Sequence, residues 1–147
     1  QYHISGTVSA ALEIVFDEPY EFEADFVQKR GRTECELYFT KNGSRINPMQ
    51  ASGGGAIDVA SFALRVACWV MNTPKTRPVL FLDEPFRYLS EGLLPKAGDF
   101  LRRISDKFGL QIIMVTHSEQ LIDSADRIFY VSQDKKGVSG VKVEDSD

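Results

Sequence analysis

The sequence is poor in the residues that bind metals or form disulfides. It contains 2 cysteines and 2 histidines, and Cys35 and Cys68 lie far apart without a CxxC pair. These residues are too few for a zinc site and form no disulfide framework, which argues against a small secreted fold. The cysteine usage favours a reducing, intracellular setting, and we expect the chain to be cytoplasmic.

Long apolar runs and an excess of positive charge are also missing. No apolar run approaches the roughly 18 residues that cross a bilayer, and no signal-peptide pattern opens the chain, so we expect no membrane partner. The 17 Lys and Arg against 21 Asp and Glu give a net charge of −4, which argues against nucleic-acid binding by bulk charge. With 43% apolar and 26% charged residues in 147, the composition predicts one folded domain. Because the chain begins with Gln1 rather than Met, we expect it to be a piece of a longer protein.

The first third of the chain alternates between apolar and other residues. This period of two predicts antiparallel strands over residues 8–16, 20–26 and 33–39. The Asn42-Gly43 pair predicts a tight turn that closes a hairpin into residues 44–47. We therefore expect residues 1–47 to form antiparallel strands.

The rest of the chain, residues 48–147, alternates between helical and buried-strand patterns. Helical spacing predicts helices over residues 55–71, 94–108 and 119–124, and continuous apolar runs predict strands over 79–82, 112–115 and 128–131. Such runs suit strands of a parallel sheet that are buried on both faces, and residues 137–143 resemble a terminal hairpin. The predicted fold is α/β, with a mostly parallel sheet, flanking helices and the antiparallel N-terminal β segment.

Two carboxylates, Asp83 and Glu84, follow the first of these apolar strands. In open α/β sheets, ligands bind at the carboxyl ends of the strands. A first carboxylate there can hold hydrated Mg²⁺, and a second can orient or deprotonate an attacking water. Taken alone, the pair is equally well explained as the start of a surface loop.

His117 stands in the same relation to the next strand, after residues 112–115 and Thr116. A single histidine at a strand end is more often structural than functional. Two neighbouring parallel strands would nevertheless bring Glu84 and His117 to one edge, where the histidine could contact a phosphate or the attacking water.

Ser52, Gly53, Gly54 and Gly55 precede the first helix of this part. Glycines let backbone N–H groups approach an anion, and the start of a helix favours negative charge. A triple glycine alone is better explained as a loop that caps the helix. The phosphate-binding sequence GxxxxGK[ST] is absent, so the chain has no complete nucleotide site of its own.

As an ordered set, these motifs resemble the C-terminal lobe of an ABC-type ATPase head. Ser52 to Gly55 resembles the signature motif, Val79–Glu84 the Walker B motif, Pro85–Ser90 the D-loop, and Thr116-His117 the switch histidine. Within the superfamily, the sequences of these motifs resemble those of the SMC, RecF and RecN group and of phage recombination-endonuclease ATPases. The resemblance implies a single C-terminal lobe over residues 1–147, without the Walker A lobe or the coiled coil.

The resemblance also implies a role for each motif residue. Asp83 would hold Mg²⁺ through water, Glu84 would be the general base, and His117 would contact the γ-phosphate of ATP. Ser52 and its three glycines would bind the ATP held by an opposite head. The implied partners are the Walker A lobe of the same parent, a second head in a homodimer, DNA and a nuclease subunit, in the cytoplasm or on the nucleoid. Such a lobe is expected to be an ATPase only when completed, and inactive alone.

Three positions depart from the family pattern. Ala51 replaces leucine and Gly55 replaces glutamine or glutamate in the signature motif, and Ser90 stands where the D-loop ends in aspartate. These departures leave open a degenerate lobe that acts as an interaction or regulatory module. A serine hydrolase that uses Ser52, His117 and an aspartate is a remote alternative, because Gln50 stands where the GxSxG elbow needs glycine.

Overall fold

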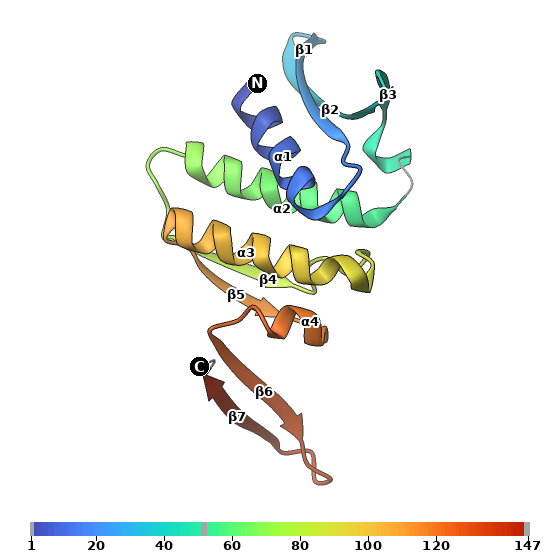
Figure 1. Cartoon of the computed structure of the whole chain (residues 1–147). Coiled ribbons are helices and arrows are strands. Elements are labelled where there is room, and N and C mark those ends of the chain that lie inside the picture. Colours follow the sequence, from blue (N-terminus) through green and yellow to red (C-terminus); the bar gives the residue numbers. More distant parts are fainter. Residues whose placement is uncertain (1, 51–52, 146–147) are drawn as a thin grey trace.

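The computed structural model describes residues 2–50 and 53–145, and its elements form a stack that runs the length of the molecule (Figure 1). The helices are α1 (Tyr2–Val15), α2 (Gly54–Met71), α3 (Leu94–Phe108) and α4 (Glu119–Ile122), with 3₁₀ turns at Pro48–Gln50 and Glu91–Leu93. The strands are β1 (Glu21–Lys29), β2 (Arg32–Lys41), β3 (Ser44–Ile46), β4 (Val79–Asp83), β5 (Gln111–Val115), β6 (Arg127–Gln133) and β7 (Ser139–Asp145). Figure 1 shows the β1–β3 sheet beside α1 at one end, α2 and α3 across the middle, and the β6–β7 hairpin at the other end.

The N-terminal segment is a helix, so the predicted strand over residues 8–16 is wrong. Helix α1 buries Val8, Ala11, Leu12 and Val15, a spacing that places them on one helical face. This face packs in the core. Two serines of the same helix accept hydrogen bonds from the backbone of strand β1. The Ser9 hydroxyl accepts the Phe22 N–H at 2.8 Å, and the Ser5 hydroxyl accepts the Ala24 N–H at 3.1 Å. The helix thereby covers an edge of β1 that a further strand would otherwise have to pair.

Strands β1, β2 and β3 form the predicted antiparallel sheet in sequence order. Its two turns have positive φ at both central residues: 51° and 74° at Arg30 and Gly31, and 52° and 75° at Asn42 and Gly43. These values fit type I′ turns, whose twist matches that of the strands. The sheet turns Phe39, 1% exposed, into the core, where its ring stacks on Tyr20 at 5.2 Å between centroids.

Helix α2 lies at the centre of the core. Its buried residues are Gly55, Ala56, Val59, Ala60, Phe62, Ala63, Val66 and Ala67. The helix has 18 residues with a mean hydropathy of 1.4, so by length and composition alone it could cross a membrane. Asp58, Ser61 and Arg65 interrupt it, so it contains no long apolar run. Its buried face packs against α1 and the rest of the core, as in the central helix of a globular domain.

The C-terminal end of α2 carries Trp69, the one tryptophan of the chain. Its ring is half-buried against the core, and the ammonium of Lys75 lies 5.4 Å from the ring centroid. Among the described residues, no group accepts a hydrogen bond from its buried Nε1.

The parallel sheet consists of β4 and β5, aligned so that Asp83 lies beside Val115. Leu82 is buried on its inner face, but Phe81 is 72% exposed on the outer face, so the prediction that this strand is buried on both faces is wrong. Strand β6 exists as predicted but pairs antiparallel with β7, in a hairpin separate from β4 and β5. The α/β fold with a parallel sheet, flanking helices and an antiparallel segment is confirmed.

Candidate active site at the carboxyl edge of the parallel sheet

The ends of β4 and β5 bring Glu84 and His117 together. The Glu84 N–H donates to the Val115 carbonyl at 2.9 Å, which extends the parallel ladder by one residue beyond Asp83. His117 follows two residues after Val115, and its Nε2 lies 3.4 Å from Glu84 Oε1. The structure thus places both side chains at one edge, as the parallel arrangement predicted. Their catalytic roles stay predictions.

The pair is open to solvent on the histidine side. The His117 side chain is 95% exposed, whereas that of Glu84 is 33% exposed. A carboxylate in this setting can accept a proton from a water molecule, and the imidazole beside it can bind an anion or orient the same water. The arrangement has the geometry of a general base with a neighbouring hydrogen-bonding group.

Asp83, the last residue of β4, is exposed next to Glu84. Among the residues that the structure describes, no group of three or more His, Cys, Asp or Glu side chains is arranged to hold a metal ion. Mg²⁺ usually keeps several waters and takes only one or two carboxylates together with substrate phosphates. A single exposed aspartate therefore fits Mg²⁺ held with a phosphate substrate and does not fit a metal cage made by the protein alone.

The backbone after β4 adopts a conformation that L-residues rarely take. Glu84 has φ of 45° and Phe86 has φ of 61°, and each such residue costs about 1–3 kcal/mol. The packing of Phe86 offsets this cost, because its side chain is 3% exposed and its ring meets that of Phe62 edge-on at 6.0 Å. A turn in which the Leu89 N–H donates to the Phe86 carbonyl at 2.9 Å completes the loop.

The predicted phosphate-binding glycines occupy the start of α2. Ser52 lies outside the described residues, so its predicted contact stays a prediction. Gly53 is exposed with φ of 108°. In Figure 1 this end of α2 and the carboxyl ends of β4 and β5 lie on the same side of the molecule.

Gly54 and Gly55 have a second role that the sequence did not suggest. A Cβ at Gly54 would stand 2.7 Å from Tyr88 Cβ, and one at Gly55 would stand 3.1 Å from Leu89 Cα. The loop after β4 therefore touches the first turn of α2, where any side chain would collide. Gly55, one of the departures from the family pattern, is required by this contact.

Sequence reasoning missed a further residue at this contact, Asp58. Its Oδ2 accepts the Tyr88 N–H at 3.0 Å, across 30 positions of sequence. The only sequence feature that marks Asp58 is its position one turn into an apolar helix. Such aspartates are too common for this feature to have identified the Tyr88 N–H as its partner.

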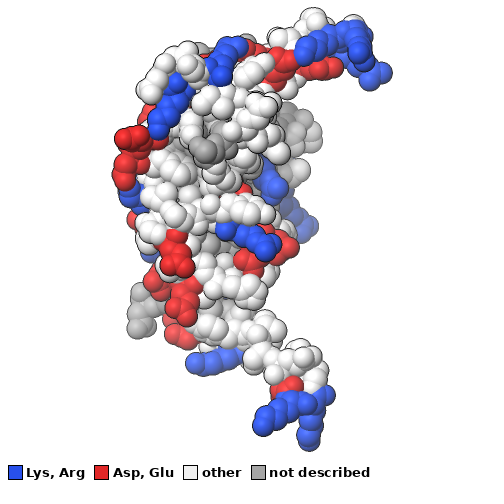
Figure 2. Space-filling view, turned by 90° about the vertical axis from the view of Figure 1, so that its right-hand side faces the viewer, with Lys and Arg blue, Asp and Glu red and all other residues white. Residues whose placement is uncertain are grey.

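Charged groups elsewhere form a structural network on the outer face of β1–β3. The Thr40 hydroxyl donates to Glu23 and lowers the pKa of that carboxyl, and Arg45, which bridges Glu23 and Asp25, lowers it further. Lys29 pairs with Glu36 and lowers the pKa of Glu36 in the same way. Figure 2 shows basic and acidic side chains intermixed along the molecule, with a group of basic side chains at each extremity.

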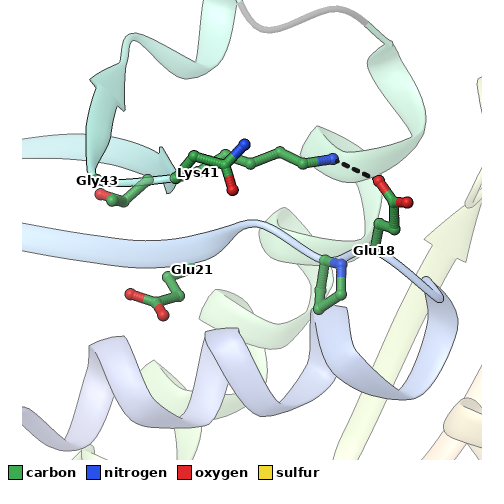
Figure 3. A pocket seen from close by; sticks show the side chains of 7 residues that line it. Glu18, Glu21, Lys41 and Gly43 are labelled. Atoms are coloured by element: carbon green, nitrogen blue, oxygen red, sulfur yellow. Dashed lines mark hydrogen bonds and ion pairs between the residues drawn. The ribbon is translucent and has the colours of Figure 1, made fainter.

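A shallow hollow lies at the turn between β2 and β3 (Figure 3). Its lining comprises Glu18, Pro19, Glu21, Thr40, Lys41, Asn42 and Gly43. Lys41 reaches across it to Glu18, with 3.2 Å between Nζ and Oε2. The hollow shares no residue with the carboxylate–histidine edge, so it does not belong to the candidate active site.

Comparison with known proteins points to one kind of ATPase. No protein-family model matches the chain. A DNA double-strand break repair Rad50 ATPase of Methanosarcina mazei is 35% identical over 141 residues, covering 84% of this chain and 12% of that protein. One of Thermococcus kodakarensis is 42% identical over 140 residues, covering 95% of this chain and 15% of that protein. The chain therefore spans only 12% and 15% of the length of these two relatives.

Among solved structures, the Smc head domain from Pyrococcus furiosus, with an extended coiled coil and bound to the C-terminal domain of ScpA, superposes with a TM-score of 0.75. It is 21% identical, and the match covers 98% of this chain and 35% of that chain. At this identity the likeness shows the fold alone. The arrangement of α1, the N-terminal sheet and the parallel strands is that of part of an SMC head.

Proposed function

This chain belongs to the SMC/Rad50-like ABC-type ATPase heads, and we propose that it supplies the water-activating half of a composite ATP-hydrolysing site. The observation that carries the proposal is the 3.4 Å approach of Glu84 and His117 at the carboxyl edge of β4 and β5. Strand β4 is followed by Glu84 and strand β5 by His117, which are the residue types that the Walker B and switch motifs require. This agreement on two adjacent strands favours an ATPase site over a chance pairing.

Each polar residue at this edge has a distinct task in the proposal. Glu84 accepts the proton of the attacking water, and its position next to β5 orients the carboxylate toward His117. His117, on the open side, would donate to the terminal phosphate, and Asp83 would hold Mg²⁺. When bound, ATP would supply the phosphoryl group, and Mg²⁺ would neutralise the charge that develops on it. Positioning of these groups accounts for most of the catalysis in phosphoryl transfer.

The remainder of the site must come from outside this chain, since the chain lacks the P-loop. The outer face of the parallel sheet exposes Phe81, Ile113 and Val115, and the edge of β5 that faces away from β4 has no strand partner among the described residues. We propose that the Walker A lobe covers this face and edge. The chain alone should then self-associate, and a monomer in size-exclusion chromatography that does not change with concentration would contradict this part.

Across a dimer, Ser52 and Gly53 would meet the nucleotide of the opposite head. Because the relatives are named for DNA double-strand break repair, we propose that the completed head works in DNA repair or recombination, with DNA and a nuclease subunit as its partners. ATP-driven engagement of two heads is the step that this lobe would control.

The test is Mg-ATP turnover by this chain co-expressed with the segment encoded upstream of it. We expect turnover that needs both pieces and falls about 100-fold or more in Glu84→Gln, since the amide cannot accept the proton. Glu91→Gln, at an exposed carboxylate in a 3₁₀ turn, is the matched control and should retain full turnover. Unchanged turnover in Glu84→Gln would refute the assignment of the base.

A degenerate binding lobe is the second candidate, and one observation favours it. Gly54 and Gly55 are packed against Tyr88 and Leu89 of their own lobe, which explains them without a phosphate. This candidate predicts a folded, ATP-binding complex without turnover, whose heads pair equally well with and without ATP.

A further inference from the structure

We propose that Asp58 is a positioning residue for Glu84: it fastens the loop after β4 to helix α2 and so sets the orientation of the catalytic carboxylate. This inference rests on the proposed function, because it concerns the same site. It adds a residue that lies outside every motif identified in the sequence.

The first support is the bond itself. Asp58 Oδ2 accepts the Tyr88 N–H at 3.0 Å, and Asp58 is half-buried on the second turn of α2. A hydrogen bond to a charged acceptor is stronger than one between neutral groups. The bond lies in the middle of the Pro85–Ser90 loop, four residues after Glu84.

The second support is that the loop and the helix are in direct contact on both sides of this bond. Toward the helix start, Gly54 and Gly55 leave the space that Tyr88 and Leu89 occupy. One turn beyond Asp58, the ring of Phe62 packs edge-on against that of Phe86. Asp58 thus lies between two packing contacts that join the same helix to the same loop.

The third support is the short, stiff connection from this contact to Glu84. Pro85 alone separates Glu84 from the anchored Phe86, and its ring restricts the backbone rotation between them. On its other side, Glu84 is held by its bond to the Val115 carbonyl. The direction of the Glu84 carboxylate is therefore determined jointly by β5 and by the start of α2.

The start of α2 is also the segment that carries the signature glycines. A displacement of this helix end on engagement with an opposite head would be transmitted through Asp58 and Phe86 to Glu84. In this way the lobe can make its general base sensitive to whether a second head is present.

The experiment compares Asp58→Ala, Asp58→Asn and the control Ser61→Ala, at an exposed position of the same helix, in the head completed with its Walker A segment. We expect kcat to fall by roughly 10- to 100-fold in Asp58→Ala, because small displacements of catalytic groups have effects of this size. The KM for ATP should stay within about twofold, since the loss concerns the chemical step. Asp58→Asn retains an acceptor oxygen and should recover most of kcat, and Ser61→Ala should match the wild type.

A second readout does not depend on turnover. Amide hydrogen exchange at Tyr88 should accelerate at least about tenfold in Asp58→Ala and little in Asp58→Asn, because the protecting acceptor is lost only in the first. If Asp58→Ala does not fold, the test uses Asp58→Asn alone. In that variant we expect both the exchange rate at Tyr88 and kcat to stay close to wild type. A large change in either quantity would refute the proposal.

The outcomes separate this inference from the proposed function. If the wild type shows no turnover that depends on Glu84, the proposed function fails, and exchange at Tyr88 still tests the hydrogen bond. If the wild type is active and Asp58→Ala has the kcat of Ser61→Ala, the positioning role is refuted. An equal loss of kcat in Asp58→Ala and Asp58→Asn would assign the effect to charge and would also overturn the proposal.

Discussion

Replacing two glycines by alanine, one at a time, tests the close contact between α2 and the loop after β4. Gly6 lies inside helix α1, and a Cβ added there would meet no heavy atom within 4 Å. Gly55 lies in the first turn of α2, where a Cβ would stand 2.9 Å from Leu89 Cδ1 and 3.1 Å from both Leu89 Cα and the Tyr88 carbonyl oxygen. The same chemical change therefore has opposite consequences at the two positions.

The magnitudes follow from helix propensity and packing. Alanine is more favourable than glycine inside a helix by about 0.5–1 kcal/mol, so Gly6→Ala should raise the free energy of unfolding by that amount. At Gly55 the new methyl group must displace the backbone of Leu89 and Tyr88, and such overpacking costs about 1–3 kcal/mol. After subtracting the propensity gain, Gly55→Ala should lower the free energy of unfolding by up to about 2 kcal/mol. The two variants should then differ by roughly 1–3 kcal/mol, which is the overpacking cost itself.

Urea unfolding followed by far-UV circular dichroism measures this difference. The urea midpoints should move in opposite directions. In a separate thermal melt, the melting temperatures should differ by roughly 3–12 °C in a chain of this size. Equal stabilisation of both variants would show that the loop does not approach the start of α2. That result would also show that packing against the loop does not explain why Gly55 replaces the glutamine or glutamate that is usual in the signature motif.

Three further predictions concern the N-terminal sheet. Phe39→Ala removes a fully buried ring stacked on Tyr20 and should lower the free energy of unfolding by about 3–5 kcal/mol, measured by the same urea titration; a loss below about 1 kcal/mol would contradict the packing. Arg30→Asn should raise it by roughly 0.5–1 kcal/mol, because Arg30 has φ of 51° in a type I′ turn and asparagine tolerates that conformation better. Because its folded pKa lies below the ordinary value of 4.5, Glu23 stabilises the fold above that pH and loses this contribution as the pH falls through the folded pKa. Glu23→Gln should therefore flatten the fall in stability below pH 4.5, and an unchanged acid limb in pH-dependent unfolding would argue against it.

The one large error of the sequence prediction, at α1, has a definite physical cause. Residues 8–16 carry apolar side chains at every second position, and two of these, Val8 and Ile14, are β-branched, which favours a strand. The buried residues of α1 are Val8, Ala11, Leu12 and Val15, and Val8 and Leu12 belong equally to the alternating and the helical pattern. Packing against α2 decides between the two, and that contact spans too much sequence for local pattern to reveal.

The parallel strands show the opposite balance. Their approximate limits and the edge at which Glu84 and His117 meet could be predicted, because an apolar run followed by polar residues marks the carboxyl end of a parallel strand. The exposure of Phe81 could not be predicted. An apolar run in the sequence looks identical whether the strand is covered by its own chain or by a separate chain. Asp58 and the positive φ of Phe86 were also beyond reach, because both depend on the three-dimensional approach of the loop to α2.

The position of Trp69 gives the chain an optical reporter. It lies 15 residues from Gly54 along a continuous helix, which corresponds to about 22 Å of axial rise, so the ring sits at the opposite end of α2 from the loop contact. Because the chain has one tryptophan, its fluorescence emission comes from this single place. A shift of the helix within the core would alter the packing around the indole and its distance from Lys75, and would change the emission wavelength or intensity. Rearrangement at the start of α2 could thus be followed in real time from its far end, without a label and without altering any residue of the site.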